Sequence, residues 1–487
     1  MKKLAKQILF GLLALALTLS LVACGGDGQT TATTTTAGDD TVTTTVADQP
    51  DATTTTTTGG KSSSTKSSST KAPSSTKKPQ GNATELSWAQ VKASMPANLN
   101  GSTLVFYNWN ELNSITDAQK AVNAFTKDTG IKIDYQVGNY ETYVTEIAAN
   151  QAAKKAPDVV RMKDLNPALL AMLQPLSNTG YDFNDKAWDE DVMSRYSYKG
   201  TAYATNMTNT VMQQPDVLFY NKELLSKYDL DDLDPYALWK KGQWNYDKFV
   251  EVCTAFKDEA GDSYTPFSPF KWQAFAQLQG SDFVLYTENG FKNNVTDTKL
   301  TDGIRKMIAM KEAGLVAEQA YQRQSFEAGK VLFFHDAIIG ARKTHFYFTD
   351  LKTKGTLGIV PLPQVGNTYT QLFAELEAYA VPVGAKNAAA VPYFLRYWLD
   401  ASNYNVNQFF TNKTALEVYN YSMKQKNRLM TYNYGYVMTE ANGFGDKLAA
   451  IFRGTAGGVV THLNEMKGQL ESAVRSTNRD LDNKLQK

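Results

Sequence analysis

The fold class is decided by residues 103–137, TLVFYNWNELNSITDAQKAVNAFTKDTGIKIDYQV. Residues 103–109 form a mostly apolar run, which predicts a buried strand. Apolar residues then recur at helical spacing from about Thr116, and Gly130 ends the predicted helix. Residues 131–137 alternate between apolar and polar side chains, as a second strand does. Strand, helix and strand in this order predict an α/β fold, in which helices cover a parallel sheet.

The same pattern continues to the end of the chain. Further strands are predicted at 158–160, 217–220, 357–360 and 375–381, and further helices at 140–153, 244–257, 388–399 and 446–487, the last broken at Gly454 to Gly458. The segment after Ala83 is too long for a single hydrophobic core, so we expect it to divide into two lobes.

The first residues carry an export signal. Lys2, Lys3 and Lys6 precede the apolar run Ile8–Val22, which is too short to span a bilayer with proper flanks. Leu21-Val22-Ala23-Cys24 resembles the lipobox of bacterial lipoproteins, in which the cysteine carries acyl chains. Residues 1–24 are therefore predicted to be a lipoprotein signal peptide, with Cys24 as the membrane anchor. The alternative is an ordinary cleavable signal in which Cys24 is incidental.

Residues 25–83 consist almost wholly of Thr, Ser, Gly, Asp, Lys and Pro. Such a segment has too little apolar surface to fold, so it is predicted to be a disordered tether. A tether of this length suits a domain held away from the membrane through a thick wall. The expected location is therefore the outer face of the cell membrane, in a Gram-positive envelope.

Charge and cysteine content exclude several classes of protein. The formal net charge is +1, and eight lysines against five aspartates precede Thr84, so the remainder is weakly acidic. Such a domain lacks the electrostatic footprint of a nucleic-acid binder. The chain has two cysteines; with Cys24 acylated, Cys253 has no disulfide partner and is expected to be a buried, inert thiol.

Seven short blocks between Thr84 and Lys487 resemble, in a consistent order, the extracellular solute-binding proteins of ABC importers that take up sugars. The blocks are Phe125–Lys132, Ala156–Asp158, Leu218–Leu224, Trp244–Phe249, Phe326–Lys330, Gly358–Pro363 and Val381–Asn387. The chain departs from the family pattern at Val331–Asp336 and at Ala204–Asn206. Each block alone is weak, but seven in order make the resemblance specific.

The resemblance implies a two-lobed periplasmic-binding-protein-like fold of type II, with parallel-rich sheets flanked by helices and a hinge between the lobes. Three crossings are expected near 206–217, 335–337 and 375–378. Lobe one would hold residues 84–210 and 336–376, and lobe two residues 211–335 and 377–487. The implied protein is a monomer that captures a mono- or oligosaccharide and delivers it to the transmembrane subunits of an ABC permease.

Sugar recognition needs flat apolar faces for ring C–H groups and planar polar groups for hydroxyls. Seven candidates lie at predicted strand ends or beside predicted crossings: Asn108, Trp109, Asn110, Glu111, Asp164, Asn206 and Glu377. An eighth candidate, Trp272, lies between Pro269 and a helical stretch. Trp109 follows the first strand at its carboxyl end, where open α/β sheets bind ligands, and Trp272 is expected to face it from lobe two. Core packing of both tryptophans and a solvated position for Asp164 and Glu377 are the alternatives.

Two other functional classes remain open at this point. Glu375 and Glu377 lie at i and i+2, so a surface-anchored glycoside hydrolase is conceivable. The only histidines are His335, His345 and His462, and no H-E-x-x-H, C-x-x-C or G-x-S-x-G motif occurs. We therefore predict no catalytic residue, no metal site and no cofactor. A wall-bound adhesin would suit the tether equally well, but it would lack a closable cleft.

Overall fold

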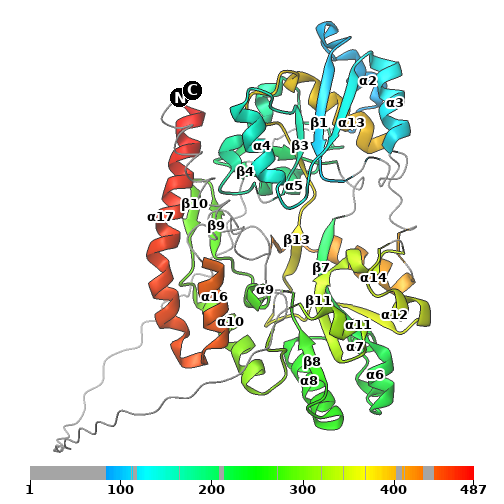
Figure 1. Ribbon diagram of the computed structural model, residues 1–487, viewed down its shortest axis with the longest axis vertical. Coiled ribbons are helices and arrows are strands. Elements are labelled where there is room, and N and C mark those ends of the chain that lie inside the picture. Colours follow the sequence, from blue (N-terminus) through cyan, green and yellow to red (C-terminus); the bar gives the residue numbers. More distant parts are fainter. Residues whose placement is uncertain are drawn as a thin grey trace, which may run out of the picture. The chain divides into compact units, whose positions relative to one another are not determined.

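The computed structural model describes residues 84–110, 112, 118–163, 165–207, 213–270, 272–319, 321–343, 345–367, 369–401, 409–410, 412–430 and 444–486. The predicted signal peptide with Cys24, and the predicted tether, lie outside these residues and stay predictions. Two larger sheets, of five and six strands, organise the described chain into two lobes (Figure 1). No helix in these ranges combines the length and the apolar character needed to cross a bilayer.

The sheet of lobe one has the strand order β2-β1-β3-β14-β6. Its strands are β1 (Thr103–Asn108), β2 (Lys132–Val137), β3 (Val159–Arg161), β6 (Ala204–Thr205) and β14 (Tyr379–Ala380). β1 is parallel to β2 and β3, whereas β14 is antiparallel to β3 and β6. The predicted opening strand, helix and strand are confirmed, since α3 lies between β1 and β2 and ends before Gly130, which has φ +75°.

Helices cover both faces of this sheet. They are α2 (Trp88–Ala93), α3 (Ala118–Thr129), α4 (Tyr143–Ala152), α5 (Glu190–Arg195) and α13 (Val391–Ala401). Successive side chains of a strand point to opposite faces, so Phe106 packs with Phe125 of α3, and Tyr107 packs with Tyr143 of α4. Phe106 also meets Phe394 of α13 edge to face, with the ring centroids 5.8 Å apart.

The sheet of lobe two is centred on the long strand β7. Its strands are β7 (Gln214–Asn221), β8 (Thr265–Ser268), β11 (Val331–Ala337), β12 (Leu357–Pro361), β13 (Gln371–Glu375) and β15 (Arg428–Met430). β7 is antiparallel to β11, β12 and β13, while β8 is parallel to β11 and β15 to β13. The pairing is thus mixed here, and the parallel pairing expected from the sequence dominates only among β1, β2 and β3.

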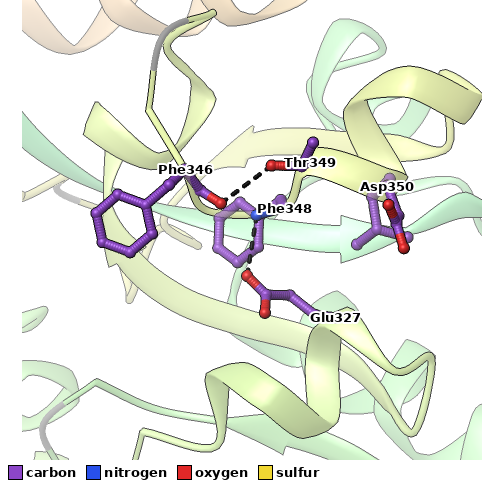
Figure 2. A pocket seen from close by; sticks show the side chains of 6 residues that line it. Glu327, Phe346, Phe348, Thr349 and Asp350 are labelled. Atoms are coloured by element: carbon purple, nitrogen blue, oxygen red, sulfur yellow. Dashed lines mark hydrogen bonds between the residues drawn. The ribbon is translucent and has the colours of Figure 1, made fainter.

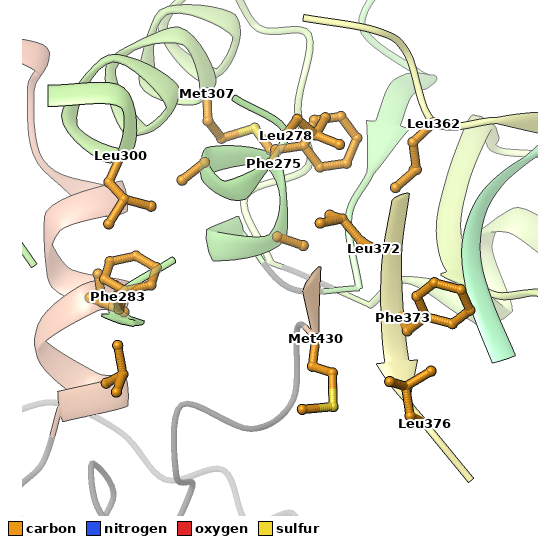
Figure 3. Close-up of a cluster of buried hydrophobic side chains, with 14 of the residues drawn as sticks. Phe275, Leu278, Phe283, Leu300, Met307, Leu362, Leu372, Phe373, Leu376 and Met430 are labelled. Carbon is orange, nitrogen blue, oxygen red and sulfur yellow. The ribbon is translucent and has the colours of Figure 1, made fainter. Parts of the chain in front are cut away.

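The largest buried cluster lies mainly among the helices of lobe two and extends into lobe one. These helices are α6 (Lys222–Lys227), α7 (Pro235–Lys240), α8 (Tyr246–Ala260), α9 (Trp272–Gln277), α10 (Thr298–Glu312), α11 (Arg323–Glu327), α12 (Thr349–Lys354), α14 (Lys413–Met423), α16 (Phe444–Arg453) and α17 (Val459–Leu485). Figure 3 shows Phe275 of α9, Met307 of α10 and Phe373 of β13 within that cluster. Cys253 is buried in α8, as predicted, and burial raises the pKa of its thiol.

The chain passes between the lobes three times. The first crossing, between β6 and β7, and the second, between β13 and β14, lie where the sequence predicted them. The third connects α13, which packs on α3 in lobe one, with α14, which packs on β12 in lobe two. The remaining predicted crossing, at residues 335–337, is not a crossing, because these residues lie inside β11.

The lobe bounds therefore differ from the predicted ones after residue 335. Residues 336–376 include β12 and β13, which both pair with β7 in lobe two. Residues 377–401 include β14 and α13, which belong to the sheet and the packing of lobe one. The reason is the long-range pairing of β7, because a strand's partner is not encoded in its own apolar pattern.

The C-terminal helix α17 contacts both lobes, and it lies beside β10 in Figure 1. Asn478 of α17 exchanges two hydrogen bonds, of 2.9 and 2.8 Å, with the main chain of Phe291 in the hairpin β9 (Val284–Thr287) and β10 (Gly290–Asn293). From lobe one, the Tyr198 hydroxyl donates to Asp482 at 3.0 Å, and Lys199 Nζ lies 2.6 Å from the same carboxylate. We call this group of contacts the α17 junction.

Two glycines in helices provide a test of the packing. A Cβ at Gly303 of α10 would lie 2.5 Å from the Ala276 carbonyl oxygen, whereas a Cβ at Gly468 of α17 would meet nothing within 4 Å. Gly303→Ala is therefore expected to destabilise the fold by about 1–3 kcal/mol through overpacking. Gly468→Ala is expected to stabilise it by roughly 0.5–1 kcal/mol through helix propensity. Urea unfolding of both variants checks the packing of α9 on α10, and equal stabilities would contradict it.

Candidate functional site

The candidate site is built from the carboxyl ends of two strands, β3 in the sheet of lobe one and β11 in the sheet of lobe two. Each of these ends lies beside a crossing between the lobes. β3 ends at Arg161, which pairs with Tyr379 at the start of β14, directly after the second crossing. β11 ends at Ala337, which pairs with Asp216 near the start of β7, directly after the first crossing. Ligands of α/β proteins bind at the carboxyl ends of strands, so the residues at these two edges form the candidate site.

On the lobe-one edge, Trp109 follows β1 and is partly buried. The guanidinium carbon of Arg161 lies 4.3 Å from the centroid of its ring. The rings of Tyr140 and Tyr143 contact it in T-shaped geometry, with centroids 5.7 and 4.8 Å away. A cation over an indole face is attractive, so these contacts fix the orientation of Trp109 relative to the sheet edge.

Arg161 is itself held by a buried ion pair. Its Nη2 donates to Glu377 Oε2, and the two side chains are only 10% and 7% exposed. Burial raises the pKa of Glu377 above its ordinary value, and the neighbouring Arg161 guanidinium opposes this rise. Glu377 therefore holds Arg161 in place, and its burial contradicts the solvated position that the sequence left open as an alternative. Its contact with the ligand stays a prediction.

Asn108 is fully buried beside Trp109. Its Oδ1 accepts a hydrogen bond of 2.8 Å from the Trp109 main-chain nitrogen, and its Nδ2 has no partner within the described part of the chain. A buried donor without a partner costs about 1–3 kcal/mol. A ligand oxygen or a water molecule at this edge would remove that cost, which keeps Asn108 among the candidate contacts.

The remaining predicted residues apart from Trp272 are Asn206, Asn110, Glu111 and Asp164. Asn206 is fully buried, and its side chain binds the main chain of Glu377 and Met207 at 2.7 and 2.8 Å, so it ties the first two crossings together. Asn110 is partly buried beside Trp109, and its carbonyl accepts from the Tyr135 hydroxyl at 2.6 Å. Glu111 and Asp164 lie outside the described residues.

Trp272 begins α9 and packs on the helix next to it. Its ring centroid lies 5.6 Å from that of Phe452 in α16, and the residue is partly buried. This is the core packing that the sequence left open as an alternative. Its role as a ligand platform stays a prediction.

On the lobe-two edge, the structure gathers residues that the sequence did not single out: Phe270, Tyr321 and Asp336. The rings of Phe270 and Tyr321 are 5.2 Å apart, and the Tyr321 main-chain nitrogen donates to Pro269, just past the end of β8, at 2.8 Å. Tyr321 is 37% exposed, and Asp336 lies buried near the end of β11. Aromatic rings beside a carboxylate are what sugar recognition requires.

Asp336 predicts a pH dependence of stability. The pKa of this carboxyl is raised to about 7. Burial is the main cause and the nearby Asp216 adds to the rise, while a hydrogen bond from the Ala337 main chain and the charge of Arg323 oppose it. Because the folded-state pKa lies above the unfolded value, the folded state retains a proton between these two pKa values. Stability is therefore expected to fall as the pH rises from about 4 to about 7, by at most about 4 kcal/mol from this group.

The variant Asp336→Asn isolates this contribution. It is expected to melt at a higher temperature than the native chain at pH 8, and by a clearly smaller margin at pH 5. Asp350→Asn, a change of an exposed carboxylate, is the matched control and should follow the native profile. A melting profile of Asp336→Asn parallel to the native one between pH 5 and 8 would contradict the assignment.

Metal binding has no support in the described ranges, where no three His, Cys, Asp or Glu side chains are grouped closely enough to hold an ion. The arrangement offers aromatic faces, a buried cation and hydrogen-bonding side chains. These groups can bind a neutral polar molecule by stacking and hydrogen bonds.

Several solved proteins are similar to this chain in fold. The sugar-binding protein MalE from Xanthomonas citri is similar with a TM-score of 0.57 and 15% identity, over 77% of this chain and 98% of its own. An ABC substrate-binding protein from Listeria monocytogenes, solved with cycloalternan, gives 0.54 and 12% identity over 76% and 98%. The GacH receptor of Streptomyces glaucescens, solved with acarbose, gives 0.53 and 16% over 76% and 98%. At these identities the likeness shows the two-lobed fold.

The family assignment rests on the sequence. No curated protein matches the chain. The model of a family described as bacterial extracellular solute-binding protein matches residues 120–412, more than half of the chain. The seven blocks and the two-lobed fold agree with this match, and the chain belongs to the family of bacterial extracellular solute-binding proteins.

Proposed function

We propose that this protein captures an extracellular carbohydrate between its two lobes and delivers it to the permease of an ABC importer. The observation that carries the proposal is the pairing of aromatic rings with polar groups at both sheet edges. Trp109 lies with Asn108 and Arg161 on lobe one, and Phe270 and Tyr321 lie with Asp336 on lobe two. Structural neighbours solved with acarbose and with cycloalternan support a carbohydrate as the ligand class.

Capture would work by differential binding. A ligand that contacts both edges stabilises the closed arrangement of the lobes, and a ligand that contacts one edge does not shift the equilibrium. The crossings tied by Asn206 and Glu377 are where the hinge rotation would occur. The ligand leaves unaltered, so the protein is a binder without catalytic activity.

The protein would act as a monomer held at the outer face of the cell membrane by acyl chains on Cys24. The tether of residues 25–83 would let the binding domain reach the permease through a Gram-positive wall. Labelled acyl incorporation in the native chain and in Cys24→Ala tests the anchor. Incorporation that survives the substitution would contradict it.

A saccharide panel tests the function itself. Melting temperature is measured with mono- and oligosaccharides in excess, and each ligand is then recovered and analysed by mass spectrometry. A binder gains melting temperature by mass action and returns the sugar intact. Release of a cleaved product would indicate a glycoside hydrolase, and the absence of any shift would favour an adhesin.

A further inference from the structure

Four aromatic rings form a continuous line on lobe two, starting at the candidate site. We call Phe270, Tyr321, Tyr347 and Phe346 the aromatic strip. Phe270 contacts Tyr321 with centroids 5.2 Å apart, the Tyr321 and Tyr347 hydroxyls are 3.1 Å apart, and Tyr347 contacts Phe346 at 4.6 Å. The line ends at Phe346, which is 71% exposed. It therefore leads from the end of β8 outward to solvent.

The outer end of the strip is held rigidly. Phe348 is buried among Phe219, Phe326 and Phe334, and its main-chain nitrogen donates to Glu327 at 3.0 Å. The Lys352 ammonium donates to the carbonyl oxygens of Arg342 and His345 at 3.0 and 2.6 Å. These contacts fix both sides of the turn that carries Phe346.

The backbone is strained at one residue of the strip and at one residue beside it. Tyr321 and Phe348 have φ values of +60° and +57°, in the left-handed region that bulky residues rarely adopt. Such a conformation is unfavourable for a bulky residue and persists only where the surrounding structure over-determines it. The fixed turn thus presents Phe346 to solvent. Phe346 adjoins the exposed Tyr321 through Tyr347, and contiguous exposed apolar groups of this kind indicate a binding surface.

Polar groups border the strip. The Arg323 guanidinium carbon lies 4.3 Å from the Tyr347 ring centroid, and Arg323 pairs with Glu327 at 3.0 Å. A small pocket of about 190 Å³ next to Phe346 is lined by Glu327, Phe348, Thr349, Asp350 and Leu351. Figure 2 shows the Phe346 ring directed away from Phe348 and Glu327. One face of that ring is stacked on His345, with centroids 4.9 Å apart.

We propose that the ligand is an oligosaccharide whose chain continues from the candidate site over Tyr347 and Phe346. This inference rests on the proposed carbohydrate function and narrows its ligand class. Phe346 and Tyr321 present exposed apolar rings to a sugar chain, and Arg323, Glu327 and Asp350 supply partners for hydroxyl groups along the line. A monosaccharide held at Phe270 and Tyr321 would leave Phe346 without a role.

The test measures affinity against chain length. Titration calorimetry is run with malto-, xylo- and cello-oligosaccharides of two to six units on the native protein and on Phe346→Ala. In the series that binds, Phe346→Ala is expected to lose roughly tenfold in affinity for the longer saccharides and less than twofold for the disaccharide. Phe346→Tyr, which keeps the ring, should retain the native affinity at every length.

Val460→Ala changes an exposed apolar residue on α17 and serves as the matched control, with no expected effect at any length. Equal affinities of the native protein and Phe346→Ala for long saccharides would overturn the inference and leave the proposed function standing. So would an equal loss for the disaccharide, because it would place Phe346 in the primary site. If the native protein binds no saccharide of any length, the proposed function and the inference fall together.

Discussion

Replacing Glu377 by alanine is expected to lower the free energy of unfolding by about 3–5 kcal/mol, because it leaves the Arg161 guanidinium buried without its carboxylate. Both side chains are nine-tenths buried, so water cannot substitute for the lost partner. The same change frees Arg161 from its position over the Trp109 ring, which is expected to weaken ligand binding as well. Urea unfolding and titration calorimetry measure the two effects.

An exposed ion pair provides the matched control for this experiment. Glu417 and Lys240 lie 3.1 Å apart with about half of each side chain exposed. Glu417→Ala is expected to leave the unfolding transition unchanged, since solvent screens such pairs. If Glu377→Ala lowers the free energy of unfolding as little as Glu417→Ala does, the buried pair does not hold Arg161 as described.

Trp109→Ala is expected to reduce carbohydrate affinity by about thirtyfold or more, as is typical for a buried aromatic anchor of about 2 kcal/mol or more at a binding site. The indole is positioned by Arg161, Tyr140 and Tyr143 at the carboxyl end of β1. Trp109→Phe keeps a flat apolar face and should lose less. Isothermal titration with the best saccharide of the panel gives the affinities.

Trp88 is the control for this substitution. It lies in α2, packs on Phe125 and Tyr397, and its indole nitrogen donates to Asp128 at 2.8 Å, away from both sheet edges. Trp88→Ala should leave the affinity at its native value. A comparable loss in both variants would indicate a general loss of folding instead of a lost ligand contact.

Local pattern was sufficient for several of the helices and strands. The helical spacing of Ala118, Ala121, Val122 and Phe125 predicted α3, and the alternation at residues 131–137 predicted β2. These segments are determined by short-range periodicity, which the sequence displays directly. The lobe bounds depend on which strands pair, and β7 joins β11, β12 and β13 over long separations, so those bounds were not predictable from local pattern.

The candidate site was predictable on one side only. Trp109 and Asn108 end a recognisable strand, so the lobe-one edge could be predicted. Phe270 and Tyr321 are about fifty positions apart. They come together because the segment that leads to Tyr321 runs alongside β8, with a bridge between Val316 and Phe267 and a hydrogen bond from Tyr321 to Pro269. Glu377 was predicted as a ligand contact from its place beside a crossing. Its ion pair with Arg161 was not predictable, because the two residues lie 216 positions apart and no local pattern reveals a partner at that separation.

The α17 junction has a practical consequence for these experiments. The carboxylate of Asp482 accepts a hydrogen bond from Tyr198 and pairs with Lys199, both of lobe one. Asp482 lies within one helical turn of the last helical residue, Leu485. An affinity tag fused to the C-terminus would therefore sit directly beside a contact that joins the lobes. Purification handles and fluorophores belong at the other end of the binding domain, ahead of Thr84, so that they do not bias its opening and closing.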